Sequence, residues 1–70
     1  MAVSARNQLK GEIVDIVLGT VMSHVTIKVG ENLIESVITR RSIDEMKLKK
    51  GDKVTAVIKA TEVLVAKGDS

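Results

Sequence analysis

The alternation of apolar and polar residues between Val21 and Val29 constrains the fold more than any other feature of this sequence. The segment reads VMSHVTIKV. Because successive side chains of a strand point to opposite faces, it predicts a strand with one buried and one exposed face. The buried set is Val21, Val25, Ile27 and Val29, and the exposed set is Met22, His24, Thr26 and Lys28. Such a strand needs others to pair with it.

Four more short runs have the length of strands. They cover residues 9–18, 33–39, 53–59 and 62–66 and are rich in Val, Ile and Leu. β-Branched side chains pack well on a pleated surface, so these runs are predicted to be strands. The tripeptide GEN at 30–32 predicts a hairpin turn, because Gly and Asn tolerate positive φ angles.

The pattern changes after residue 41, where SIDEMK predicts one or two turns of helix. Glu45 follows Ser42 by three residues, which is the spacing of a capping box. The predicted order is three strands, a short helix and two strands. This order matches the OB-fold, an all-β, five-stranded Greek-key barrel with one short helix between strands 3 and 4. It would form a single domain over residues 1–70, and a sandwich of the same strands is the alternative.

The first run is apolar on both faces towards its end, which predicts an oligomer. Val14 and Ile16 share one face, and Ile13 and Val17 share the other. A strand covered on both sides needs two cores or a partner subunit. A chain of 70 residues buries little surface by itself, and with no Cys and one His it can form neither a disulfide nor a zinc cage.

The residue content disfavours several classes of function. No Cys nucleophile, catalytic-triad motif or Gly-rich phosphate loop occurs, so we do not expect an enzyme. No apolar stretch approaches the roughly 18 residues of a membrane span, and MAVSARN is unlike a signal peptide, so we expect a cytoplasmic protein. Single-stranded nucleic-acid binding is the alternative function for an OB-fold. It relies on aromatic side chains, and this chain has none.

Two polar clusters flank the apolar runs. Ser4 and Arg6 precede the first run, Lys59 and Ala60 end and follow the fourth, and Thr39 ends the third. These residue types are ordinary at turns and strand ends. They also suit an oxyanion site, because Arg and Lys supply positive charge while hydroxyls and backbone N–H groups donate further hydrogen bonds. From the residues alone, both interpretations stay open.

Four strings of the sequence together resemble a known family. SARNQLKG, GTVMSHV, SVIT and KKGDKVTAVIKATEV are similar to segments of the molbindins, the small molybdate-binding Mop-domain proteins, over about residues 3–66. The resemblance implies an OB-like fold and a hexamer arranged as a trimer of dimers. It implies molybdate or tungstate bound between subunits for molybdenum storage or homeostasis, with no other cofactor and no bare metal cation.

The resemblance also implies which residues hold the oxyanion. One site would use the N-terminal Ser-x-Arg-Asn segment, the Thr that ends the third strand and the Lys-Ala segment, here Ser4, Arg6, Thr39, Lys59 and Ala60. A second site would lie near a three-fold axis and use Val21, Met22, Ser23 and His24. For His24, an ordinary exposed strand histidine is the competing interpretation. Molybdate is a tetrahedral dianion with no proton to donate, and a pocket of donors suits it.

Overall fold

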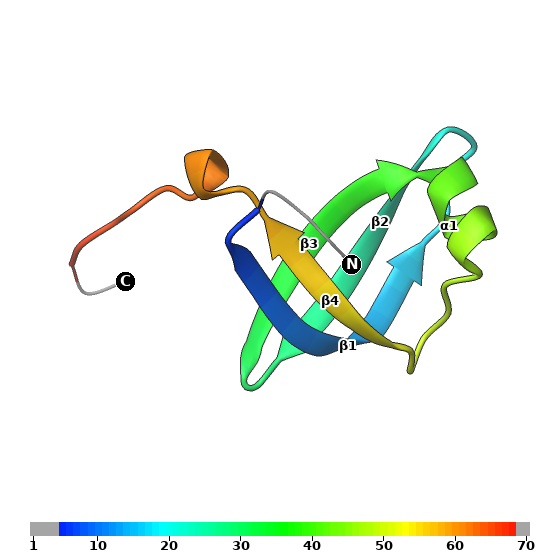
Figure 1. Cartoon of the computed structure of the whole chain (residues 1–70). Helices are drawn as coiled ribbons and strands as arrows, with labels where there is room; N and C mark the ends of the chain where they lie inside the picture. The colour runs from blue at the N-terminus through cyan, green and yellow to red at the C-terminus, as the bar shows by residue number, and fades with distance from the viewer. Residues whose placement is uncertain (1–4, 69–70) are drawn as a thin grey trace.

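The computed structural model describes residues 5–68 and shows one curled antiparallel sheet with a short helix at one end (Figure 1). The elements in chain order are β1 (Asn7–Val17), β2 (Met22–Val29), β3 (Asn32–Thr39), α1 (Arg40–Met46), β4 (Lys53–Ile58) and the 3-10 helix η1 (Ala60–Glu62). The strands lie in the order β3-β2-β1-β4. This is the OB-like arrangement that the sequence predicts, with four strands in place of five.

β1 is the strand that joins the two halves of the sheet. Its first half pairs with β4 and its second half with β2. Gly11 lies close to the point where the halves meet, and a Cβ there would lie 2.5 Å from the backbone oxygen of Lys28. Only glycine allows the backbone to approach this closely. Figure 1 shows β1 curving through this region, which curls the sheet into an open barrel.

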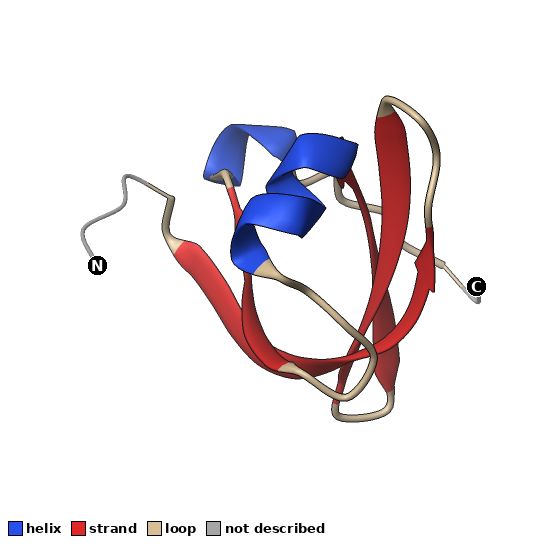
Figure 2. Cartoon of the chain, turned by 90° about the vertical axis from the view of Figure 1, so that its right-hand side faces the viewer, coloured by secondary structure: helices blue, strands red, loops and turns tan. Residues whose placement is uncertain are grey.

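The core lies inside the curl of the sheet. Its fully buried hydrophobic residues are Ile13, Val25, Ile27, Ile43 and Ala56. α1 packs against β2 and β3 and contributes Ile43, which covers one end of the curl (Figure 2). The predicted alternation is confirmed for Val25 and Ile27. Val21 precedes the strand and is exposed, contrary to the prediction.

The two-faced apolar pattern predicted for the first strand is wrong, because β1 contains a bulge. The register between β1 and β2 shifts between Ile13 and Asp15. A bulge leaves one residue without a partner and so changes which side chains share a face. As a result Ile13 and Ile16 both pack in the core, whereas Val17 is exposed.

The capping residue of the helix also differs from the prediction. Thr39 and not Ser42 is the N-cap, because the Thr39 hydroxyl oxygen accepts a hydrogen bond from the Ser42 backbone N–H at 3.0 Å. β3 ends at Thr39 and α1 begins at the next residue. One side chain therefore closes the strand and caps the helix.

The fifth strand predicted at 62–66 does not form in this structure. Residues 60–62 make η1, which turns the chain away from the edge of β4, and the following residues run away from the barrel (Figure 1). We call residues 63–67 the tail; its Leu64 and Val65 are 93% and 92% exposed. Within residues 5–68 the sheet therefore stays open between its two edge strands, β3 and β4.

Candidate functional site

Arg6 and Lys59 flank the same end of the β1–β4 ladder. The last pair of that ladder is Asn7 opposite Ile58. In an antiparallel pair, the residue that precedes one strand meets the residue that follows the other. Both Arg6 and Lys59 are exposed, and neither forms an ion pair with any other residue between 5 and 68. Two cations from opposite ends of the chain are thus neighbours and available to an anion.

Ala60 lies beside this pair and opens η1. The turn is closed by the Glu62 backbone N–H, which donates to the Lys59 carbonyl oxygen at 2.9 Å. Ala60 is exposed, so its backbone is accessible from solvent. Ser4, which the sequence places in the same site, lies outside the described residues. Three of the five residues predicted for this site therefore come together at one end of the sheet: Arg6, Lys59 and Ala60.

Thr39 does not join them within one copy of the chain. It is the last residue of β3, and β3 runs in the same direction as β1 because both are antiparallel to β2. Thr39 therefore lies at the end of the sheet opposite Arg6. Its hydroxyl is also engaged locally, since it accepts from the Ser42 N–H and donates to Ser42 Oγ at 2.9 Å.

The residues predicted for the second site separate onto different faces. Ser23 points into the barrel and is buried, and its hydroxyl oxygen accepts a hydrogen bond from the Gly19 N–H at 3.2 Å. Met22 and His24 point outward. The Val21 carbonyl oxygen accepts from the Arg40 N–H at 2.8 Å. In one copy, these four side chains do not converge on a common point.

His24 has an acidic partner that the sequence analysis missed. His24 Nε2 lies 3.2 Å from Glu35 Oε2, and Thr26 Oγ1 donates to Glu35 Oε1 at 2.8 Å. The β2–β3 register places Thr26 opposite Glu35 and His24 opposite Val37, so Glu35 is a diagonal neighbour of His24. Only the register of the hairpin, which follows from the turn at 30–31, could have revealed this pair.

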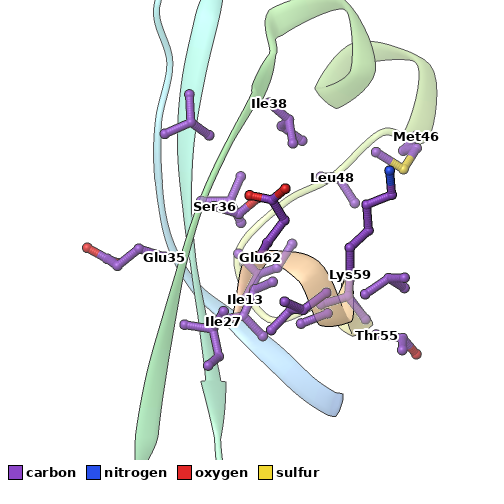
Figure 3. Close-up of a pocket in the computed structure, with 17 residues that line it drawn as sticks. Ile13, Ile27, Glu35, Ser36, Ile38, Met46, Leu48, Thr55, Lys59 and Glu62 are labelled. Carbon is purple, nitrogen blue, oxygen red and sulfur yellow. The ribbon is translucent and has the colours of Figure 1, made fainter. Parts of the chain in front are cut away.

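An open groove of about 710 Å³ runs between the edges of β3 and β4. Its walls are mainly apolar and include Ile34, Ile38, Val54, Ala56 and Ile58. Lys59 and Glu62 also line it, as Figure 3 shows. The groove occupies the gap that a fifth strand would fill. The apolar run EVLVA was therefore its sequence signal, although we read that run as a strand of the same barrel.

Two carboxylates are paired with lysines at the other end of β4. Lys53 Nζ donates to Glu12 Oε1 at 2.6 Å, and this hydrogen bond lowers the pKa of Glu12. Lys49 donates to Asp52 through both Nζ and its backbone N–H, at 3.0 Å each, and lowers the pKa of Asp52. Because β4 starts at Lys53 and ends just before Lys59, these carboxylates lie away from the Arg6–Lys59 end.

The described part of the chain shows no group of three or more His, Asp or Glu side chains placed to hold a metal ion. In the same residues, neither helix has the length and apolar character that a membrane crossing requires. The Arg6–Lys59 end of the sheet and the groove beside it therefore remain the candidate site, and their donors suit an anion rather than a cation.

Comparisons with known proteins agree with one another. The family model described as the TOBE domain matches residues 3–65. Molybdenum-pterin-binding protein 1 of Clostridium pasteurianum is 42% identical over 66 residues, which are 93% of this chain and 97% of that protein. The structure of MopII from Clostridium pasteurianum superimposes with a TM-score of 0.88 at 40% identity, over 94% of this chain and all of that one. A molybdate-binding protein from Sporomusa ovata superimposes with a TM-score of 0.91 at 40% identity, over 96% and 100% of the two chains.

Proposed function

The chain belongs to the TOBE-domain family, and on this premise we propose that it binds molybdate or tungstate at sites shared between copies of itself, for molybdenum storage or homeostasis in the cell. The observation that carries the proposal is the meeting of Arg6 and Lys59 at the end of the β1–β4 ladder. The choice of ligand is supported by the relatives, which are named molybdenum-pterin-binding and molybdate-binding proteins.

The charge of the site matches that of the ligand. Molybdate carries two negative charges, and burying it costs several kcal/mol unless the charges are paired. The guanidinium of Arg6 and the ammonium of Lys59 together carry two positive charges. The planar guanidinium can donate two parallel hydrogen bonds to neighbouring oxyanion oxygens, and the ammonium adds a compact charge. The site would thus hold the dianion with formal neutrality.

The donors also discriminate among oxyanions. Arg and Lys side chains can only donate hydrogen bonds. Hydrogen phosphate carries a proton that needs an acceptor, so a site made of donors binds it poorly. Sulfate has the same charge as molybdate and is smaller, so the dimensions of the closed site have to reject it. Molybdate and tungstate are alike in both respects and are expected to compete.

A second copy of the chain would complete the site. Thr39, the remaining described residue predicted for it, lies at the opposite end of the same sheet. One copy therefore presents the two cations at one end and the hydroxyl at the other. Two copies packed with opposite orientation would bring the Thr39 end of one to the Arg6 end of its partner. This arrangement accounts for the otherwise divided set of residues.

The groove and the tail offer the physical means for copies to join. The tail carries Val63, Leu64 and Val65, all exposed, and the groove lies between two strand edges. An extended segment placed there can pair with a free edge and bury its apolar side chains. If two copies exchange tails, each barrel gains a fifth strand, and the turn at Lys59 comes to lie at the border between the copies. Three such pairs would make the predicted hexamer.

Thermal unfolding in the presence of different anions tests the proposal. A ligand that binds only the folded protein stabilises it by about 2.7 kcal/mol at a concentration of 100 Kd. Molybdate and tungstate are expected to raise the unfolding midpoint, and equal concentrations of sulfate and phosphate are expected to raise it much less. A midpoint that responds to a single-stranded oligonucleotide and not to molybdate would favour nucleic-acid binding instead.

A further inference from the structure

A second exposed apolar surface lies on the outside of the sheet. We call it the outer patch and define it as Val17 of β1, Met22 of β2 and Val37 of β3. Val17 and Val37 are the cross-strand neighbours of His24 on its two sides. Met22 lies two residues before His24, on the same face of β2. The patch therefore spans three adjacent strands around one histidine.

The exposure of the outer patch is high for large apolar side chains at neighbouring positions. Val17 and Val37 are 61% and 62% exposed, and Leu18 and Val21 extend the patch into the loop between β1 and β2. Contiguous apolar surface of this kind usually marks an interface. Exchange of tails would not cover it, because Val17 and Met22 lie on the two inner strands of the sheet and the groove lies between the outer ones.

The charges around the patch indicate what covers it. The outer face carries Lys28 on β2, Asp15 on β1 and Glu35 on β3, and His24 pairs with Glu35. Charges of both signs are therefore interleaved. Such a face is complementary to a rotated copy of itself, whereas nucleic acid requires a basic face and a basic protein an acidic one. The fitting partner is a second copy of this chain.

Symmetry gives an independent reason. Exchange of tails uses one groove and one tail of each copy, so it closes on itself within a pair. Any assembly larger than a pair needs a second contact made by a different surface. Val37 lies on β3, which also borders the groove, so the outer patch continues directly from the surface at which tails would be exchanged.

We propose that pairs of this chain join through the outer patch into the larger assembly. The inference rests on the pair described under the proposed function and assigns the surface that links one pair to the next. Burial of Val17 and Met22 drives the contact. The His24–Glu35 pair lies at its centre, where the imidazole supplies a hydrogen-bond partner to a carboxylate that loses water.

Native mass spectrometry of charged variants, with and without molybdate, tests this assignment. Val17→Lys places a cation in the outer patch on an inner strand. Leu33→Lys is the matched control, because Leu33 is equally exposed at 61% and lies on the outer face of β3, beyond Glu35 and outside the patch. We expect the wild type and Leu33→Lys to form hexamers and Val17→Lys to form dimers. Met22→Lys, also in the patch, is expected to reproduce the dimer and supports the assignment should Val17→Lys fail to fold.

The outcomes separate this inference from the proposed function. Dimers that still bind molybdate support both, and dimers that bind none support the patch while contradicting the ligand. Hexamers of both patch variants overturn the inference. So do monomers, which would place the patch inside the pair, and so does a wild type no larger than a dimer. Equal dissociation of Leu33→Lys would also overturn it, because charge alone would then explain the effect.

Discussion

Arg6 precedes β1 at the same end of the sheet where Lys59 follows β4, one step beyond the pair formed by Asn7 and Ile58. The relationship follows from antiparallel pairing of the first and fourth strands. It brings together two cations that are almost a whole chain apart in sequence. Within residues 5–68 neither of them has an acidic partner, so their charges remain available to a ligand.

Replacement of Arg6 is expected to weaken molybdate binding strongly. Loss of a hydrogen bond to a charged group costs about 1.5–3 kcal/mol, and about 1.4 kcal/mol corresponds to a factor of ten. Arg6→Ala is therefore expected to reduce affinity roughly tenfold to more than a hundredfold in a calorimetric titration. Arg6→Lys is expected to weaken binding as well, because an ammonium cannot donate two parallel hydrogen bonds.

Arg41→Ala is the control for these variants. Arg41 lies on α1, its side chain is 87% exposed, and its Nε contacts Glu45 Oε1 at 2.8 Å. An exposed pair of this kind contributes little to stability. Its removal is expected to leave molybdate affinity unchanged. If Arg41→Ala binds more weakly while Arg6→Ala binds like the wild type, the site lies on the helix side of the molecule.

Replacement of Thr39 is expected to lower stability as well as affinity. Its hydroxyl caps α1, and loss of an N-cap costs about 0.5–2 kcal/mol. Urea unfolding of Thr39→Val without ligand is expected to show this loss, and Thr39→Ser, which keeps the hydroxyl, is expected to retain most of the stability. The affinity of Thr39→Val for molybdate is expected to fall less than that of Arg6→Ala. An unchanged unfolding midpoint would mean that the cap is not used in solution.

Truncating the apolar tail at one position is expected to weaken assembly. Burial of a Leu or Val side chain contributes about 1.5–3 kcal/mol, so Leu64→Asp is expected to dissociate the oligomer at concentrations where the wild type stays assembled. Lys67→Asp adds the same charge at the end of the tail and is the control. Sedimentation velocity at micromolar concentration distinguishes the two. Equal behaviour of both variants would show that the tail does not enter the groove.

The ion pair between Glu12 and Lys53 is expected to make stability fall in acid. The hydrogen bond from Lys53 lowers the pKa of Glu12 from its ordinary 4.5. A lowered pKa contributes stability above the ordinary value, and the contribution is lost as pH falls through the lowered one. Thermal midpoints measured from pH 6 downward, at steps of about 0.5, are expected to fall less steeply in Glu12→Gln. Glu31→Gln, in the exposed hairpin turn, is expected to follow the wild type.

Much of the fold could be predicted from local pattern. Alternation at Val25 and Ile27 identifies a strand with one buried face, and the turn at 30–31 follows from Gly30, which adopts a φ of +61°. The bulge after Ile13 could not be predicted, because it is a feature of pairing with β2 and not of β1 alone. The capping role of Thr39 was missed because the same residue also ends a strand.

The site was predictable only in part. Resemblance to a known family, which the comparisons confirm, indicated Arg6 and Lys59, but only the strand register shows that they meet. The apolar run at 62–66 was recognised as a strand. In one copy it has no edge to pair with, because η1 carries it away from its own groove. A segment whose partner is another molecule cannot be assigned its place from the pattern of its own chain.

Native mass spectrometry of the wild type, recorded with and without molybdate at micromolar protein concentration, tests the sharing of sites between copies most directly. It measures the number of copies and the number of bound oxyanions in the same particle. The account predicts an oligomer built from pairs, to which molybdate binds and from which Arg6→Ala removes bound molybdate without changing the number of copies. A folded monomer that binds molybdate by itself would contradict the account.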